Sequence, residues 1–163
     1  MSGDPKWRGY NIALGDDEDR KAINVAAGDA QASSFLQFNE DGPARWGDAH
    51  RVARQEIVEV RRLQNVLDEI LRGRPDARIY VKLDTQGLDL TVLRSAGEKL
   101  SAILGFQAEI AAHHFYEGMT SFGEAIDAYR ELGFEITGVF PLSREFDNLR
   151  VIEFDFVFMR RPT

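Results

Sequence analysis

The sequence contains no cysteine in 163 residues, which excludes disulfides, thiolate zinc sites and cysteine nucleophiles. It has no uninterrupted apolar stretch approaching the ~20 residues that a membrane-spanning helix needs. The first residues, Met-Ser-Gly-Asp-Pro-Lys, lack the apolar run of a signal peptide. We therefore expect a soluble, cytoplasmic protein without a membrane partner.

Basic residues are also in the minority. The chain has 20 Lys and Arg against 27 Asp and Glu, a formal net charge of −7. Because nucleic-acid binding needs clustered cations, we expect no nucleic-acid partner. The glycine patterns G-x-G-x-x-G, G-x-x-x-x-G-K-[ST] and G-x-S-x-G are missing as well, so the sequence indicates neither a nucleotide loop of these kinds nor an α/β-hydrolase elbow.

Hydrophobic residues make up 44% of the chain, enough to build one core, and we expect a single domain over residues 1–163. Its first part predicts a strand over 7–14, an acidic turn at 16–19 and a second strand over 21–25. Residues 26–50 show no hydrophobic period. They predict a long surface loop, either a lid over a site or an ordinary connection.

The middle of the chain alternates strand and helix signals. Residues 56–62 predict a strand, and the helix that follows has an apolar stripe formed by Leu63, Val66, Leu67, Ile70 and Leu71. Residues 79–83 predict a second strand, followed by a turn at 84–87 and a helix with Leu88, Val92 and Ala96 on one face.

The last part predicts a strand over 104–110 and a helix that begins at Ser121, where Glu124 completes a capping-box spacing. Strands over 134–140 and 151–159 then predict an antiparallel hairpin. The order strand, helix, strand, helix, strand, strand is typical of an α/β sheet of parallel strands with an antiparallel C-terminal hairpin at its edge.

Two acidic residues lie near strand ends, where open α/β sheets bind ligands. Asp84 ends one predicted strand, and Glu109 lies near the end of the next. If these strands are parallel neighbours, both carboxylates face one crevice and can act as acid, base or cation ligand. Asp84 is equally compatible with a helix cap for the segment that follows.

A lysine and two histidines close to these acids are further candidates for a functional site. Lys82 lies in a predicted buried strand, where it needs a partner such as Asp84 or a substrate, unless its ammonium reaches solvent at the sheet margin. His113 follows Glu109 by four residues, and together with His114 the three side chains could hold a metal if that segment were helical. No zinc motif is matched, so we favour a metal-free site in which His113 acts as a general base.

Several motifs together resemble the FkbM-type methyltransferase family. Residues 81–90, V-K-L-D-T-Q-G-L-D-L, are similar to its K-I-D-x-[EQ]-G-x-E signature, and Val92-Leu93 with Ala96-Gly97 continues the match. The later stretches Phe106-Gln107-Ala108-Glu109, Tyr116-Glu117-Gly118, Ser121-Phe122 and Gly133-Phe134, and the upstream Asn11-Ile12-Ala13-Leu14-Gly15 and Ser33-Ser34, follow the family pattern in the same order.

The resemblance implies a Rossmann-like class I methyltransferase sheet and methyl transfer from S-adenosylmethionine to a hydroxyl oxygen of a small molecule or sugar. It places the cofactor near Lys82, Asp84, Gln86 and Gly87. It leaves Asp84, Glu109 or His113 to accept the proton that the hydroxyl group loses. Gln86 stands where many relatives have Glu. This departure is conservative.

The family's glycine-rich turn after the first strand and the acid ending the second have no counterpart here, so the chain resembles the C-terminal part of such an enzyme. The strand over 79–83 would then have an open edge, which invites pairing. We expect a homodimer, pairing with a separate N-terminal portion, or a rearranged sheet in which residues 55–62 or 9–25 cover that edge. The alternative function is a non-catalytic remnant that serves as an interaction or oligomerisation module.

Overall fold

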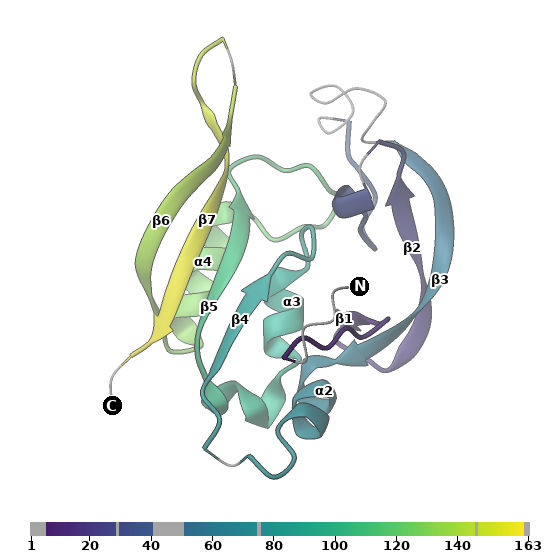
Figure 1. The fold of residues 1–163 in the computed structure, drawn as a ribbon. Helices are drawn as coiled ribbons and strands as arrows, with labels where there is room; N and C mark the ends of the chain where they lie inside the picture. Colours follow the sequence, from purple (N-terminus) through teal and green to yellow (C-terminus); the bar gives the residue numbers. More distant parts are fainter. Residues whose placement is uncertain (1–5, 29, 41–50, 75, 146, 162–163) are drawn as a thin grey trace.

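The described residues form a mixed α/β structure with two β-sheets, one of three strands and one of four (Figure 1). The computed structural model describes residues 6–28, 30–40, 51–74, 76–145 and 147–161. The three-stranded sheet has the order β1-β3-β2, and the four-stranded sheet has the order β4-β5-β7-β6. Parallel and antiparallel strands occur in both.

The four-stranded sheet contains the parallel strand pair and the C-terminal hairpin that were expected from the sequence. β4 (Ile79–Leu83) is parallel to β5 (Ile103–Ala111). The antiparallel hairpin of β6 (Phe134–Arg144) and β7 (Val151–Arg160) joins β5 through β7. The predicted hairpin is confirmed, and its strands extend further than the hydrophobic alternation indicated.

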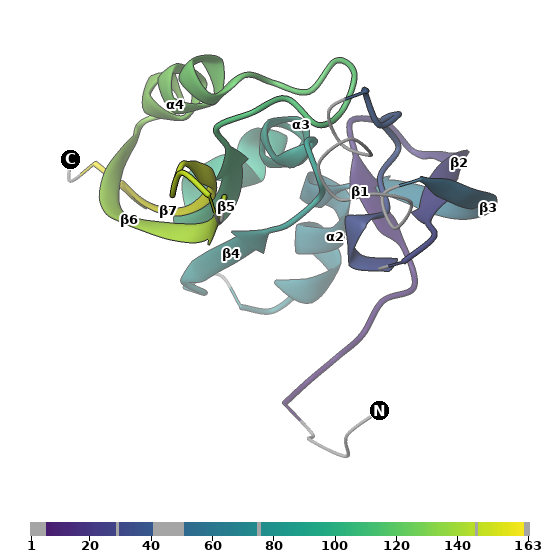
Figure 2. The ribbon, with the colours of Figure 1, turned by 90° about the horizontal axis from the view of Figure 1, so that it is seen from above.

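One face of this sheet is covered by helices (Figure 2). They are α3 (Asp89–Arg94) and α4 (Phe122–Glu131), with a 3-10 helix over Gly97–Ala102 between them in the chain. The predicted capping box begins α4: the Glu124 amide donates to the Ser121 hydroxyl, and the Ser121 amide donates to the Glu124 carboxylate at 3.0 Å. This cap fixes where α4 enters the core.

Aromatic side chains fill the space between sheet and helices. Phe106 of β5 is fully buried, and its ring centroid lies 4.8 Å from those of Tyr129 and Phe158. Phe134 packs edge-on against the same ring at 5.0 Å. Rings at these distances bury large apolar areas and attract one another through their quadrupoles, so they hold α4 on the sheet.

The opposite face of the four-stranded sheet is open. The strand register places Tyr80, Met159 and Phe140 on this face, and their side chains are among the exposed large hydrophobics of the molecule. Parallel strand pairs usually occur in sheets with both faces covered. The β4–β5 pair is therefore unusual in facing solvent on one side.

The three-stranded sheet contains β1 (Ala13–Gly15), β2 (Asp19–Ala26) and β3 (Val52–Arg62), and α2 (Leu63–Ile70) follows directly. The predictions of β2, β3 and α2 are confirmed. The strand expected over 7–14 is wrong in extent, because only its last residues pair with β3 while residues 6–12 form no strand.

The expectation that residues 55–62 or 9–25 cover the edge of β4 is also wrong. β2 pairs with β3 along its whole length, from Asp19 opposite Val60 to Ala26 opposite Val52. β1 occupies the other edge of β3. Both edges of β3 are thus used within its own sheet, and β4 remains an edge strand.

The loop predicted over 26–50 is partly ordered. It contains a 3-10 helix over Ala30–Ala32, and isolated bridges join Ser34 to Asn24 and Phe38 to Tyr116. Residues 41–50 of this prediction lie outside the described residues. None of the helices among the described residues reaches the length and hydropathy needed to span a bilayer.

Candidate functional site

The loop that leaves β4 has an unusual backbone. Gln86 has φ 49°, rare for a residue with a side chain, and Gly87 has φ 96°. Asp89 closes the loop by accepting hydrogen bonds from the Thr85 amide at 2.8 Å and the Thr85 hydroxyl at 2.5 Å. The N-cap of α3 is Leu88, so the prediction that Asp84 caps this helix is wrong.

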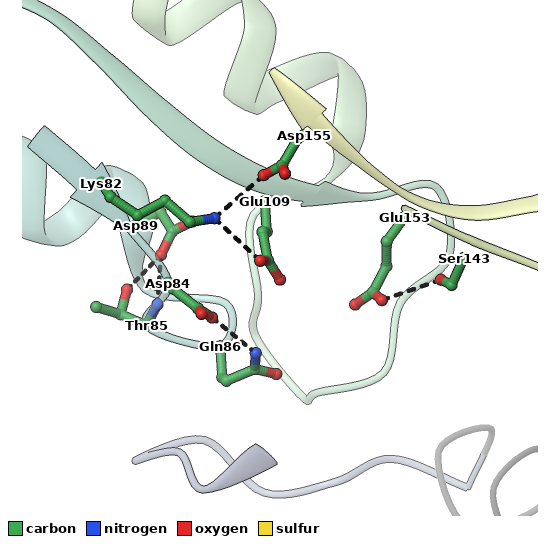
Figure 3. Close-up of polar contacts among 9 residues, drawn as sticks. All are labelled: Lys82, Asp84, Thr85, Gln86, Asp89, Glu109, Ser143, Glu153 and Asp155. Carbon is green, nitrogen blue, oxygen red and sulfur yellow. Dashed lines mark hydrogen bonds and ion pairs between the residues drawn. The ribbon is translucent and has the colours of Figure 1, made fainter. Parts of the chain in front are cut away.

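Three hydrogen bonds hold Gln86 in its left-handed conformation. The Ser34 hydroxyl donates to the Gln86 carbonyl oxygen and the Tyr116 hydroxyl to Gln86 Oε1, both at 2.8 Å. Gln86 Nε2 donates to Asp84 Oδ1 at 3.0 Å (Figure 3). Left-handed backbone persists only where its surroundings enforce it, and such positions concentrate at functional sites.

Gly87 is required by close packing as well as by its φ angle. A Cβ at this position would lie 3.0 Å from Leu36 Cδ1 and 3.2 Å from Met119 Cβ. The segment around Leu36 and the segment after β5 thus press on the loop from two sides. The Gln86–Gly87 turn is therefore fixed in position at the carboxyl end of β4.

Lys82 lies on the open face of the sheet and joins three strands (Figure 3). Its Nζ donates to Glu109 Oε1 of β5 at 3.0 Å and to Asp155 Oδ1 of β7 at 3.1 Å. The predicted pairing of Lys82 with Asp84 is wrong. Partial burial disfavours the charged ammonium, but the bonds to the two carboxylates outweigh it and raise the pKa of Lys82.

Two other acids near this end of the sheet are more buried. Burial raises the pKa of Asp89, against the opposing effect of the hydrogen bonds from Thr85. Burial also raises the pKa of Glu153 on β7, whose Oε2 accepts a hydrogen bond from the Ser143 hydroxyl at 3.1 Å. Together with Asp84 and Glu109 they make the carboxyl end of the sheet acidic.

A pocket opens beside this acidic end of the sheet. Its cavity volume is about 40 Å³, and the hollow around it, with the part that is open to solvent, amounts to about 540 Å³. Glu109 and the Gln86–Gly87 turn line it, and Phe115, Tyr116 and Met119 from the segment after β5 supply apolar walls. A few polar groups in a mostly apolar hollow are typical of sites for small molecules.

The structure brings together part of the predicted site. Gln86, Gly87 and Glu109 line the pocket, whereas Lys82, Asp84 and His113 do not. Asp84 is exposed just after the last residue of β4, beside the Gln86–Gly87 turn at the rim of the pocket. His113 lies in the loop after β5, which is a strand as far as Ala111, so the helical pairing of Glu109 with His113 does not form.

Sequence reasoning missed the two acids of β7. Glu153 and Asp155 alternate with Phe154 and Phe156, so the period-two pattern that identified the strand also placed these acids on its other face. That alternation is the signal that could have found them. Ser34 and Tyr116, which fix Gln86, were noticed only as parts of motifs and had no assigned role.

Comparison with known proteins assigns the chain to a family. The family model described as the methyltransferase FkbM domain matches residues 4–136. The match includes β4, β5 and the loop between β4 and α3, while β7 with its two acids follows the matched segment. Searches of the curated proteins and of the solved structures found no match. Because the family model covers most of the sequence, this chain belongs to the FkbM methyltransferase domain family.

Proposed function

We propose that the chain is an S-adenosylmethionine-dependent methyltransferase that acts on a hydroxyl oxygen of a small molecule or sugar. One observation carries the proposal: the neighbouring parallel strands β4 and β5 bring Asp84 and Glu109 to the same end of the sheet, beside a pocket (Figure 3). The family membership supports methyl transfer. The cytoplasmic location stays a prediction.

The proposal includes a Rossmann-like sheet. Two features support it: the order β4-β5-β7-β6 with β7 antiparallel, and helices α3 and α4 on one face. In open sheets of this kind, ligands bind beyond the carboxyl ends of the parallel strands. The pocket and the rim at Asp84 lie at that end.

The residues at this end fit the chemistry of the cofactor. S-adenosylmethionine combines a sulfonium and an ammonium group with ribose hydroxyls and an apolar ring. Carboxylates attract the cations and accept hydrogen bonds from the hydroxyls. Asp84 is exposed, the side chain of Glu109 keeps 25% of its surface open to solvent, and Phe115 and Met119 offer apolar surface.

Within this site we assign cofactor contacts to Asp84 and to the Gln86–Gly87 turn. Lys82 has a different role, because its ammonium is already held by two carboxylates. It fixes the orientation of Glu109 and limits how far that side chain can move. Lys82 is therefore a positioning residue in this proposal, and the cofactor contact that the family resemblance implied for it becomes indirect.

When bound, the cofactor supplies an electrophilic methyl group. The acceptor oxygen must lose its proton as its bond to the methyl carbon forms, so a base has to stand beside it. Glu109 lines the pocket, whereas Asp84 and His113 do not. We therefore assign to Glu109 the role of the base that accepts this proton. The remaining contribution of the chain is to hold donor and acceptor in line.

Titration calorimetry with S-adenosylhomocysteine on the full chain tests the binding step. We expect the wild type to bind and Asp84→Ala to lose affinity at least tenfold. Asp127→Asn, which removes an exposed carboxylate from α4, is the matched control and should bind like the wild type. Unchanged affinity in Asp84→Ala would contradict the assignment of that residue.

Turnover is tested by following release of the demethylated cofactor with a panel of hydroxylated small molecules and sugars. Glu109→Gln should bind S-adenosylhomocysteine but lose turnover with every acceptor that the wild type uses. Equal turnover in the wild type and Glu109→Gln would remove Glu109 as the base and leave Asp84 or His113.

A non-catalytic interaction module is the second candidate. The observation that favours it is the outer edge of β4, which has no partner among the described residues. Absence of binding with S-adenosylmethionine and its demethylated product at millimolar concentration, in a chain whose fold is intact, would support the module and contradict the enzyme.

A further inference from the structure

The outer edge of β4 has no strand partner in the part of the chain that the structure describes. β4 pairs with β5 on one side only, and no described residue is hydrogen-bonded to its other side. The strand contains neither proline nor glycine, and Tyr80, its second residue, is 52% exposed. Exposed edges of this kind pair with other strands unless the sequence blocks them.

A lysine on an edge strand is a common block against such pairing. Lys82 does not act in this way, because its ammonium turns into the sheet toward Glu109 and Asp155 (Figure 3). Its charge is neutralised on the open face and does not guard the backbone of the outer edge. The outer edge of β4 is therefore open to pairing with another strand.

The same chain has a strand-like segment without a partner. Residues 7–12 form no hydrogen bond or ion pair in the described part of the chain, and they include Trp7, 72% exposed, and Tyr10, 45% exposed. Figure 2 shows this purple segment running away from both sheets. Its aromatic residues favour strands, and sequence patterning predicts one there. We call residues 7–12 the arm.

The charges of the arm and of the open sheet face are complementary. The arm carries the cation Arg8 next to Trp7. The sheet face next to β4 carries the carboxylates of Asp84, Glu109, Glu153 and Asp155 against the ammonium of Lys82, and the carboxylates are in excess. Two such faces would repel one another, so the arm is a better partner for this region than a second copy of the face.

We propose that the arm of one copy adds as a strand to the outer edge of β4 in a second copy, so that two chains exchange arms in a homodimer. The exchange pairs the open backbone groups of β4 and removes Trp7 and Tyr10 from water. It concerns assembly and does not rest on the proposed methyl transfer.

Sedimentation equilibrium of the full chain tests the assembly. The wild type should be dimeric at tens of micromolar, and the double variant Trp7→Asp, Tyr10→Asp should raise the dimer dissociation constant at least tenfold. Leu149→Asp is the matched control, because Leu149 is 67% exposed in the connection between β6 and β7. It should leave the dimer unchanged. Since Trp7 and Tyr10 are exposed within one copy, circular dichroism should show an intact fold in each variant.

A monomeric wild type would overturn the proposal. So would a dimer that the arm variant leaves unchanged, or one that Leu149→Asp weakens equally.

Engineered disulfides test the contact itself, and the absence of native cysteine gives a clean background. Tyr10→Cys and Tyr80→Cys, mixed and oxidised, should form a cross-linked heterodimer. Tyr80→Cys mixed with Leu149→Cys should not. Cross-linking of Tyr80→Cys with itself, without any to Tyr10→Cys, would show β4 pairing with β4 and would contradict arm exchange.

Discussion

At the scale of single residues, the turn after β4 combines a left-handed glutamine with a glycine that has no room for a side chain. Gln86 depends on Ser34 and Tyr116, which belong to distant parts of the sequence. Gly87 is packed against Leu36 and Met119. The rim of the pocket is therefore held by tertiary contacts and does not depend on the turn sequence alone.

Gly87→Ala should lower the free energy of unfolding by about 2–3 kcal/mol, because it adds close contacts to the cost of a left-handed φ. Gly118→Ala is the control: Gly118 has φ 73°, and a Cβ there would have no neighbour within 4 Å. It should cost about 1–2 kcal/mol. Urea unfolding measures both, and equal losses would mean that packing around Gly87 contributes nothing.

Lys82→Met should lower the free energy of unfolding near neutral pH by about 1–2 kcal/mol. The value lies between those of exposed and buried ion pairs, because the side chain is partly exposed. The variant leaves Glu109 and Asp155 close together without the ammonium between them. Lys99→Met, which removes the surface pair with Asp68, should cost less.

The pH dependence of this effect follows from the raised pKa of Lys82. A raised pKa means that the stabilisation is complete below the ordinary value of 10.5 and declines as the pH rises through the folded-state pKa. The difference in the free energy of unfolding between the wild type and Lys82→Met should therefore shrink above pH 10.5. A difference that grows there would contradict the ion-pair explanation.

The sequence singled out Lys82, Asp84, Gln86, Gly87 and Glu109 through a motif, but it could not supply the partners of Lys82. Asp155 lies 73 positions further along the chain. Whether it reaches Lys82 depends on the register of β5 with β7, and register is set by the whole sheet.

At the scale of elements, α4 begins with reciprocal hydrogen bonds between Ser121 and Glu124. Ser121→Ala should lower the free energy of unfolding by about 1 kcal/mol. Ser101→Ala is the control, because the Ser101 hydroxyl only donates to the exposed carbonyl of Glu98. Thermal melts of the two variants should differ, and equal midpoints would contradict a role for the cap.

The same variant should change the titration of Glu124. Hydrogen bonds from the Ser121 side chain and backbone lower the pKa of Glu124. The stabilisation is then present above the ordinary value of 4.5 and is lost as the pH falls through the folded-state pKa. An NMR titration of Ser121→Ala should show the pKa of Glu124 moving up toward 4.5.

Elements with strong local signals were predictable. The apolar stripe of α2, the capping box of α4 and the alternating phenylalanines of β7 each depend on a few neighbouring residues. The segment 7–14 has similar strand residues but lacks a partner over most of its length. A strand needs a partner as well as suitable side chains, and a sequence pattern shows only the side chains.

At the scale of the whole molecule, the chain divides its strands between two sheets. The parallel β4–β5 pair and the β6–β7 hairpin followed from the succession of strand and helix signals, whereas the place of β7 between β5 and β6 was not predicted. The separate three-stranded sheet was not predicted either, because the long β2–β3 pairing joins segments on either side of a loop. Pairing between such segments depends on loop closure and register rather than on local preference.

The central claim is that the carboxyl end of β4 and β5 binds the methyl donor. An amide NMR titration of the full chain with S-adenosylhomocysteine tests it most directly. We predict that the perturbed amides gather in residues 84–87, in residues 109–111 and at Tyr116. Perturbations confined to the three-stranded sheet, or none at millimolar ligand, would contradict the account.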